Sequence, residues 1–226
     1  MKTILIIGGS KGIGKSVLLQ QLDLGNKVIN LSRTKIDITH NNLLSYEFDI
    51  LNPNFPTIDN VSHLIYCPGS INLKPFSSLN MDDFRTDMEI NFFGAIACIK
   101  NYLPALKKEQ NSSIVLFSTA AAKMGMPFHT SISAAKSALE GFAKSLAAEL
   151  APNVRVNTIA PSIVDTTLAS RILRNDSIKE KITNNHPLKR ILNTAEVAET
   201  VNYLCNSLSI SGQTITLDNG ITTLKI

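Results

Sequence analysis

The stretch TILIIGGSKGIGKS, residues 3–16, decides the fold of this chain. Residues 3–7 form a continuous apolar run of mostly β-branched side chains, which is typical of a buried parallel strand. Glycines follow at once, and apolar residues then recur at helical spacing at Val17, Leu18, Leu19 and Leu22. The segment therefore predicts a strand, a tight turn and a helix. Backbone amides in that turn and the positive end of the helix together form a ready site for a phosphate.

Short apolar runs and longer amphipathic segments alternate along the rest of the chain. Further strands are predicted at residues 27–31, 44–48, 64–67, 114–117, 154–159 and 214–217. Apolar residues step by three or four from Phe84 to Leu106 and from Ile132 to Leu150, and a weaker helical pattern covers residues 194–207. This alternation predicts an α/β fold, a doubly wound parallel sheet with helices on both faces. We expect the whole chain, residues 1–226, to form a single domain.

The composition is that of an ordinary packed domain and excludes several classes of protein. Hydrophobic residues make up 44% of the 226 residues and charged residues 18%, which argues against disorder and against a disulfide-rich scaffold. The net charge is +4, but the basic residues are scattered, so no nucleic-acid partner is expected. The three cysteines lie far apart, so we expect no disulfide, no metal site and a cytoplasmic location. No stretch approaches the roughly 18 apolar residues of a membrane span, and no membrane partner is expected.

The glycine loop fits two phosphate-binding patterns. Residues 9–16 fit GxxxxGK[ST], the P-loop of ATP and GTP hydrolases, in which Lys15 would contact the terminal phosphates and Ser16 a magnesium ion. The spacing GxxxGxG, which favours a dinucleotide, is met by Gly8, Gly12 and Gly14. A P-loop enzyme also needs an Asp that ends a hydrophobic strand, and the candidate Asp49 follows a segment that is too polar. The dinucleotide pattern is favoured, and a P-loop phosphotransferase is the remote alternative.

Several later segments support the dinucleotide pattern. They are, with the loop itself, IIGGSKGIG at 6–14, FDI at 48–50, YCPG at 66–69, NFFG at 91–94, SISAAKSALEG at 131–141, RVNTIAPSIVDT at 155–166 and GQTITLDNG at 212–220. In this order and spacing the chain resembles the short-chain dehydrogenase/reductase family from its first strand to its last. The resemblance implies a Rossmann-like sheet that binds NAD(H) or NADP(H). It also implies transfer of a hydride between the nicotinamide and a small-molecule carbonyl or alcohol.

The resemblance assigns the coenzyme site residue by residue. The three loop glycines would seat the pyrophosphate, and Asp49 matches the acidic residue that contacts the adenine. Gly69 keeps one position of a motif in which Cys67 and Pro68 replace Asn and Ala. Pro161, Val164 and Thr166 resemble the residues that cover the nicotinamide carboxamide, with Ser162 in place of a glycine. The expected coenzyme contacts are Gly8, Ser10, Lys11, Gly12, Ile13, Gly14, Arg33, Asp49, Ile50, Gly69, Lys136, Pro161, Val164 and Thr166.

The end of the second strand bears on the choice of coenzyme. It reads Asn30-Leu31-Ser32-Arg33, with no acidic residue placed to bind the 2′-hydroxyl of the adenosine ribose. Arg33, and Lys11 in the glycine loop, stand where NADP-preferring members of the family carry cations. A guanidinium and an ammonium suit a 2′-phosphate. NADP(H) is therefore expected in preference to NAD(H).

The resemblance also places the reacting groups, and one of them is missing. Asn91 matches the family's active-site Asn, which positions a water in the proton relay, and a buried amide at that point of the helix needs partners. Family members carry Tyr-x-x-x-Lys at the start of the second long helix, where the phenol is the general acid or base and the Lys holds the nicotinamide ribose. Lys136 is kept, but Ile132 replaces the Tyr and cannot transfer a proton. Thr119 replaces the usual Ser and keeps a hydroxyl for a substrate carbonyl.

Another group must therefore transfer the proton in an active enzyme. A positioned acid or base contributes roughly 10²–10⁴-fold to a rate, so the loss of the phenol is severe without being total. Replacement donors near the gap are His129, Ser131, Ser133 and Tyr66. His129 has the best chemistry near neutral pH, although a loop histidine is more often only solvated. The candidate catalytic residues are Asn91, Thr119, Lys136 and His129.

Two functions from different classes remain open. The first is an NADP-dependent oxidoreductase with an atypical proton donor. The second is a pseudoenzyme, a sensor or assembly subunit that binds the coenzyme without reducing a substrate, and Ile132 favours it.

Three further expectations concern shape and assembly. The apolar faces of the two long helices exceed what one sheet face covers, so a homodimer or homotetramer is expected. The connections from Arg33 to Asp49 and from Asp49 to Cys67 are short, so one or both of their crossover helices should be clipped. Residues 165–192 are expected to form a mobile, basic lid over the substrate, with Arg171, Arg174, Lys179, Lys181, Lys189 and Arg190.

Overall fold

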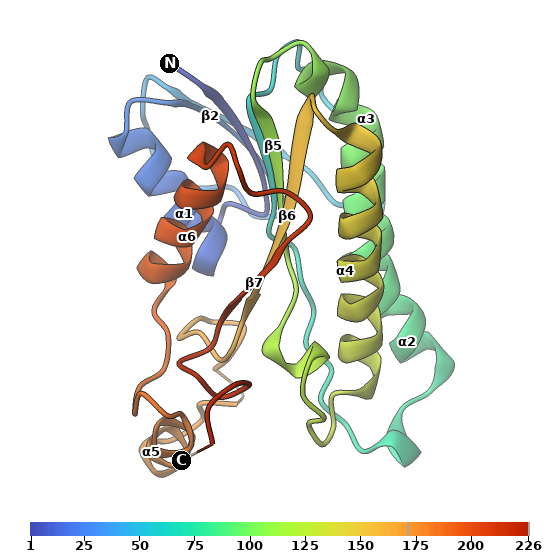
Figure 1. The fold of residues 1–226 in the computed structure, drawn as a ribbon, viewed down its shortest axis with the longest axis vertical. Coiled ribbons are helices and arrows are strands. Elements are labelled where there is room, and N and C mark those ends of the chain that lie inside the picture. Colours follow the sequence, from blue (N-terminus) through green and yellow to red (C-terminus); the bar gives the residue numbers. More distant parts are fainter. Residues whose placement is uncertain (171, 226) are drawn as a thin grey trace.

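A computed structural model describes residues 1–170 and 172–225 and shows a single parallel sheet (Figure 1). The strands are β1 (Thr3–Ile7), β2 (Lys27–Ser32), β3 (Leu43–Glu47), β4 (His63–Tyr66), β5 (Ser112–Phe117), β6 (Val154–Pro161) and β7 (Thr214–Leu217). They lie in the order β3-β2-β1-β4-β5-β6-β7, and every neighbouring pair is parallel. The predicted doubly wound α/β fold is confirmed.

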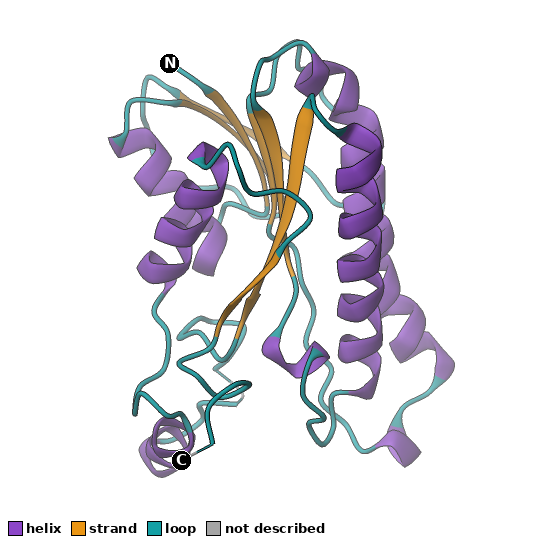
Figure 2. Ribbon diagram, in the orientation of Figure 1, coloured by secondary structure: helices purple, strands orange, loops and turns teal. Residues whose placement is uncertain are grey.

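Helices cover both faces of this sheet (Figures 1 and 2). One face carries α1 (Gly12–Asp23) and α6 (Thr194–Asn206), and the other carries α2 (Met81–Met88), α3 (Gly94–Lys107) and α4 (Thr130–Leu150). Each face has its own apolar core, built around Leu18 and Val201 on the first and around Tyr102 and Leu139 on the second. No helix in the described part of the chain is long and apolar enough to cross a membrane.

The carboxyl ends of the strands form the edge at which a ligand site is expected. β1 pairs with β2 on one side and with β4 on the other, so the strand order reverses at β1. Ligands of doubly wound sheets bind in the crevice beyond such a reversal. The short helix α5 (Asp176–Asn185) lies beyond these strand ends, close to the C-terminal end of the chain (Figure 1).

The two connections around β3 contain no helix. Residues 33–42 and 48–62, all within the described ranges, run as turns and irregular chain, so the clipped crossovers that the sequence predicts are confirmed. As a result β3 is covered less than its neighbours, and Leu44 and Tyr46 are 45% and 40% exposed. The polar strand segment that argued against a P-loop is therefore an edge strand with no helix over it.

The apolar pattern predicted that the first long helix is continuous. Instead, a π-helical turn at Glu89–Phe93 separates α2 from α3. The Tyr66 hydroxyl donates to the Ile90 carbonyl over 2.6 Å, and the Asn91 amide donates to the Asp87 carbonyl over 2.8 Å. Side-chain bonds to backbone carbonyls of a helix are a recognised cause of such local widening. The turn brings buried Asn91 to the edge of the sheet where the strands end.

Gly94→Ala tests the close packing behind this turn. The substitution is expected to lower the free energy of unfolding by about 1–3 kcal/mol through overpacking. The reason is that a Cβ at residue 94 would lie 2.4 Å from both Ile50 Cγ1 and the Tyr66 hydroxyl oxygen. Denaturant titration followed by circular dichroism measures the change.

Gly141→Ala is the matched control, because Gly141 lies inside α4 and its added Cβ meets nothing within 4 Å. Alanine there is expected to raise the free energy of unfolding by about 0.5–1 kcal/mol. Equal free energies of unfolding for Gly94→Ala and the wild type would contradict the packing described above.

Candidate active site

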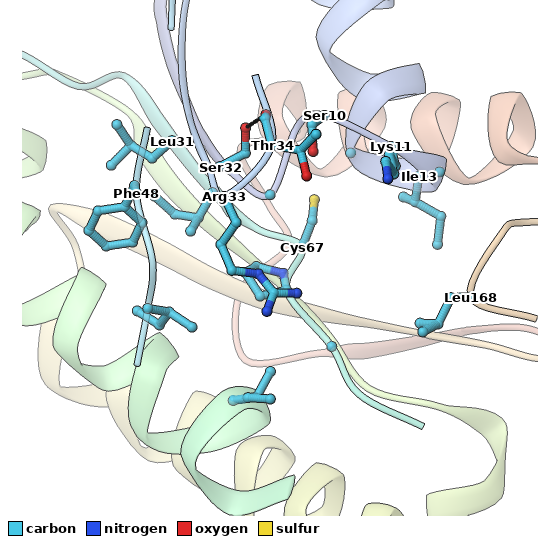
Figure 3. A pocket seen from close by; sticks show the side chains of 18 of the residues that line it. Ser10, Lys11, Ile13, Leu31, Ser32, Arg33, Thr34, Phe48, Cys67 and Leu168 are labelled. Carbon is cyan, nitrogen blue, oxygen red and sulfur yellow. Dashed lines mark hydrogen bonds between the residues drawn. The ribbon is translucent and has the colours of Figure 1, made fainter. Parts of the chain in front are cut away.

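A crevice of about 430 Å³ opens at the carboxyl ends of β1, β2 and β4 (Figure 3). Leu31 and Phe48 lie at one end and Leu168 at the other, with Lys11 and Arg33 among the side chains between them (Figure 3). Most of the expected coenzyme contacts line this crevice: Gly8, Ser10, Lys11, Gly12, Ile13, Gly14, Arg33, Asp49, Ile50, Gly69 and Thr166. The remaining three, Lys136, Pro161 and Val164, line an adjoining cavity. Segments that are far apart in sequence thus meet at one edge of the sheet.

The glycine turn has the shape that a dinucleotide phosphate requires. Gly12 adopts a φ of +53°, and a Cβ at Gly14 would lie 2.2 Å from the Gly8 carbonyl oxygen, so neither position accepts an ordinary side chain. The turn therefore presents backbone amides at the start of α1, where phosphates bind. Asn30 of β2 supports it, because its Oδ1 accepts a 2.9 Å hydrogen bond from the Gly9 amide. No sequence motif pointed to this role for Asn30.

The end of the crevice beside the carboxyl ends of β2 and β3 carries both signs of charge. Arg33 follows β2 and is exposed, and Asp49 Oδ1 accepts a hydrogen bond from the Leu51 amide over 3.1 Å. A smaller cavity of about 230 Å³ beside them is lined by Arg33, Glu47, Phe48, Asp49, Asn52 and Asn54. A cation, amides and carboxylates at this point can hold an adenosine ribose and its substituents.

The second cavity, of about 340 Å³, is continuous with the first through shared lining residues, among them Cys67, Gly69 and Thr166. Its walls are mainly apolar, with side chains such as Ile71, Met124, Ile172 and Ile182. The polar groups in the lining include Ser70, Asn91, Ser118, Thr119, His129, Lys136, Ser162 and His186. A mainly apolar pocket with a few convergent polar groups is the usual form of a small-molecule site.

Lys136 is the buried cation of this second cavity. It is only 7% exposed, and its Nζ donates to the Phe117 carbonyl over 2.7 Å. Burial lowers its pKa to about 8, and the nearby Cys67 and Asp87 oppose that effect. Four residues earlier on α4, Ile132 is also buried and lines the cavity, so an apolar side chain occupies the point where the resemblance expects a phenol.

Asn91 has the buried partners that the sequence predicted. Its Nδ2 donates to Ser70 Oγ and to the Asp87 carbonyl, both over 2.8 Å. Its Oδ1 has no hydrogen-bond partner anywhere in the described chain. The Ser70 hydroxyl donates in turn to Asp87 Oδ1. Sequence reasoning missed Ser70 and Asp87, because they are separated by 17 residues and meet only through the packing of α2 against the loop after β4.

The four candidate proton donors differ in where they lie. His129 lines the second cavity, and its Nδ1 is 2.7 Å from the Pro127 carbonyl oxygen. The Tyr66 hydroxyl is bonded to Ile90, and burial raises the pKa of Tyr66. The Ser133 hydroxyl donates to the Ala121 carbonyl over 3.1 Å, and Ser131 is buried. Of these four side chains only that of His129 lines the cavity.

The segment that was expected to form a lid contains α5. Two of its cations are paired, Lys179 with Asp165 over 2.8 Å and Arg190 with Glu196, whereas Arg174 and Lys181 are exposed. Arg171 lies outside the described residues. The segment also supplies His186, which the sequence did not single out. His186 is 3% exposed, its Nδ1 lies 2.8 Å from the Ile182 carbonyl oxygen, and its Nε2 has no partner among residues 1–170 and 172–225.

The P-loop alternative does not fit this geometry. Lys15 is exposed on α1, and the Ser16 hydroxyl donates to Thr194 of α6 over 2.7 Å instead of facing the crevice. A magnesium-dependent phosphate site would need both side chains on the ligand.

Comparisons with known proteins identify the family. Residues 17–222 match the family model described as enoyl-(acyl carrier protein) reductase. The chain belongs to the short-chain dehydrogenase/reductase family. It is 31% identical to carbonyl reductase family member 4 of Xenopus laevis, over 97% of this chain and 98% of that protein. It is 29% identical to the 3-oxoacyl-[acyl-carrier-protein] reductase of Aquifex aeolicus, over 97% of each chain.

A solved structure supports the same assignment. The ligand-free aldohexose dehydrogenase of Thermoplasma acidophilum matches with a TM-score of 0.90 and 25% identity, over 99% of this chain and 95% of that one. By its family, this short-chain dehydrogenase/reductase is an oxidoreductase of the NAD(P)(H)-dependent type.

The lowered pKa of Lys136 predicts a pH dependence of stability. The unfolded chain binds more protons than the folded chain between pH 8 and 10.5, so the free energy of unfolding rises with pH in that window. The free energy of unfolding of the wild type, relative to that of Lys136→Met, is expected to rise by roughly 1–3 kcal/mol from pH about 8 to pH about 10. Chemical denaturation at a series of pH values measures it. Lys144→Met, at an exposed position of the same helix, should show no such rise, and parallel curves for Lys136→Met and wild type would contradict the burial of this charge.

Proposed function

We propose that this chain interconverts a small-molecule carbonyl and alcohol with NADP(H) as its coenzyme. The observation that carries the proposal is the continuity of two cavities, one with a glycine turn and a cation for a phosphorylated dinucleotide and one mainly apolar with Thr119, Asn91 and Lys136 in its lining. The residues present fit a nicotinamide dinucleotide, because the turn excludes side chains at Gly12 and Gly14. When bound, the coenzyme supplies or accepts the hydride.

The chain's own residues would bind and orient the reactants. Lys136, whose Nζ donates to the Phe117 carbonyl, would hold the coenzyme ribose, as the family resemblance implies, and its charge would stabilise developing negative charge between mainly apolar walls. Thr119 Oγ1 accepts a bond from the Ala121 amide over 3.3 Å, and its hydroxyl hydrogen can donate to a substrate carbonyl. Val164 and Thr166 would cover the carboxamide, as the family resemblance implies. The apolar walls exclude water from the reacting atoms.

The coenzyme preference can be measured directly. Arg33→Ala and Lys11→Ala are each expected to raise the Kd for NADPH about tenfold and to leave the Kd for NADH nearly unchanged, because only NADPH carries the 2′-phosphate. Fluorescence titration measures both constants. Lys15→Ala, at an exposed lysine in the first turn of α1, is the control and should change neither constant. Equal affinity of the wild type for NADPH and NADH would refute the preference.

The second candidate function, a coenzyme-binding pseudoenzyme, is favoured by one observation. Ile132, which cannot transfer a proton, is buried in the cavity lining four residues before Lys136. Under this alternative the protein binds the coenzyme as a sensor or assembly subunit.

Ile132→Tyr separates the two functions. If the chain is an active reductase with another donor, the wild type oxidises NADPH with a panel of ketones, and Ile132→Tyr changes kcat by less than about tenfold. A silent wild type with a strongly active Ile132→Tyr variant would instead establish the pseudoenzyme. Ile132→Phe is the matched control, because it adds the ring without the hydroxyl. Absorbance at the NADPH band reports turnover.

We also propose that the protein works as a homodimer or homotetramer. Phe93, beside α3, is 47% exposed, and the solvent face of α4 consists largely of small residues, namely Ala134, Ser137, Gly141, Ser145 and Ala148. Small side chains let a second helix approach closely.

A further inference from the structure

A buried carboxylate lies behind the second cavity and has no part in the function proposed above. Asp87 belongs to the last turn of α2 and is 1% exposed. Its Oδ1 accepts a hydrogen bond from the Ser70 hydroxyl, and its Oδ2 has no partner within the described residues. A buried carboxylate that has one free oxygen is costly unless it serves a purpose, since buried polar atoms are normally paired.

The hydrogen bonds around Asp87 are directed towards the cavity. Ser70 donates to Asp87 and at the same time accepts from Asn91 Nδ2 over 2.8 Å. Ser70 is half-buried. Its side chain lines the cavity, and so do the buried side chains of Asn91 and Lys136. A continuous path of hydrogen-bonding groups therefore runs from the cavity through the Ser70 hydroxyl to the Asp87 carboxylate.

The surroundings hold this path in place. A capping box between Asn80 and Asp83 fixes the start of α2, and Lys74 bonds to Asp83 over 3.0 Å. At the other end, the Asn91 amide binds the Asp87 carbonyl across the π-helical turn. The charge of Lys136 lies near enough to Asp87 to interact with it. A fixed carboxylate and a cation beside a mainly apolar cavity suit proton transfer to or from a bound substrate.

We propose that Ser70 and Asp87 form the proton relay of this enzyme, with the Ser70 hydroxyl contacting the substrate oxygen and Asp87 acting through it. The relay takes the role of the phenol that Ile132 replaces, and it rests on the oxidoreductase function proposed above. It adds a catalytic residue, Ser70, and a carboxylate, Asp87, to Thr119 and Lys136.

The proton transfer balances in both directions. In alcohol oxidation the substrate carbon loses a hydride to the nicotinamide coenzyme and the substrate O–H bond breaks. The substrate proton passes to Ser70 Oγ while the proton of Ser70 passes to Asp87 Oδ1. The products are a carbonyl compound, reduced coenzyme and a protonated carboxyl, which returns its proton through Ser70 to water after product release. Carbonyl reduction follows the reverse sequence, in which protonated Asp87 supplies the proton through Ser70.

Asp87→Asn is the decisive variant, because an asparagine oxygen still accepts the hydrogen bond of Ser70 but cannot take up its proton. We expect kcat to fall at least about a hundredfold with a panel of small ketones and secondary alcohols, with KM and the Kd of NADPH nearly unchanged. Ser70→Ala should lower kcat by a similar factor. The double variant that combines Asp87→Asn and Ser70→Ala should lower kcat no further than either single variant, because the two residues act as a unit. Ser70→Thr, which keeps a hydroxyl, should retain most of the activity.

Two control variants distinguish the relay from a loss of charge on α2 and from catalysis by His129. Asp82→Asn, an exposed position of the same helix, should leave kcat unchanged. His129→Ala tests the donor that the sequence suggests, and the relay requires its loss of kcat to be smaller than that of Asp87→Asn. A large loss in His129→Ala together with a normal kcat in Asp87→Asn would overturn the proposal.

A measurement without coenzyme keeps the relay testable if the proposed function fails. Failure of the function means that the protein binds no NADPH or NADH, or turns over no carbonyl or alcohol. In protein labelled with ¹³C at the aspartate carboxyl carbons, the signal that disappears in Asp87→Asn identifies Asp87. That signal should shift in Ser70→Ala, because the Ser70 hydroxyl donates to Asp87 Oδ1. A signal that is insensitive to Ser70→Ala would overturn the relay whatever the turnover.

Discussion

The rest of this structure depends on how closely the backbone of the first βα turn packs on itself. At Gly14 the chain passes so near the Gly8 carbonyl that a Cβ would lie 2.2 Å from its oxygen, and at Gly12 it takes a φ of +53°. Only glycine satisfies both conditions, and the result is a start of α1 whose amides face the crevice. The Asn30 side chain, from the neighbouring strand, holds the turn by its bond to the Gly9 amide. A diphosphate held at this turn, as proposed, would determine which part of the sheet edge faces the reacting end of the coenzyme.

From that turn the two cavities continue into each other, and their chemistry changes along the way. The first offers backbone amides and the exposed cations Lys11 and Arg33, which suit a charged and hydrated ligand. The second has mainly apolar walls around a small number of buried polar groups. Among these mainly apolar walls the charge of Lys136 is less screened than in bulk water, so its proposed effect on a substrate oxygen is larger than it would be in water. The same burial explains why its pKa falls to about 8.

Sequence reasoning recovered the sheet, its helices and the lining of the crevice because these follow from local patterns. Each of these patterns occupies only a few neighbouring residues: a short apolar run for a strand, a glycine spacing for the turn, or a short motif at the end of a strand. Contacts between distant segments were not visible in this way. The Tyr66 hydroxyl, from β4, donates to the Ile90 carbonyl within the π-helical turn, and nothing in the helical pattern of residues 84–106 predicts this turn or this contact. Likewise the bond between Ser70 and Asp87 depends on the angle at which α2 meets the loop after β4.

The replacement at residue 132 changes what the buried groups around it are free to do. A phenol at that point of α4 would place an acid in the cavity lining four residues before Lys136, whereas isoleucine contributes only apolar surface. A buried carboxylate is tolerated when a charge and hydrogen bonds compensate its desolvation. Asp87 has one hydroxyl partner and a neighbouring lysine, and one oxygen without a partner, so its compensation is incomplete in the described chain. In the proposed relay Asp87 takes up a proton, and Ser70 offers the path by which that proton arrives from a substrate.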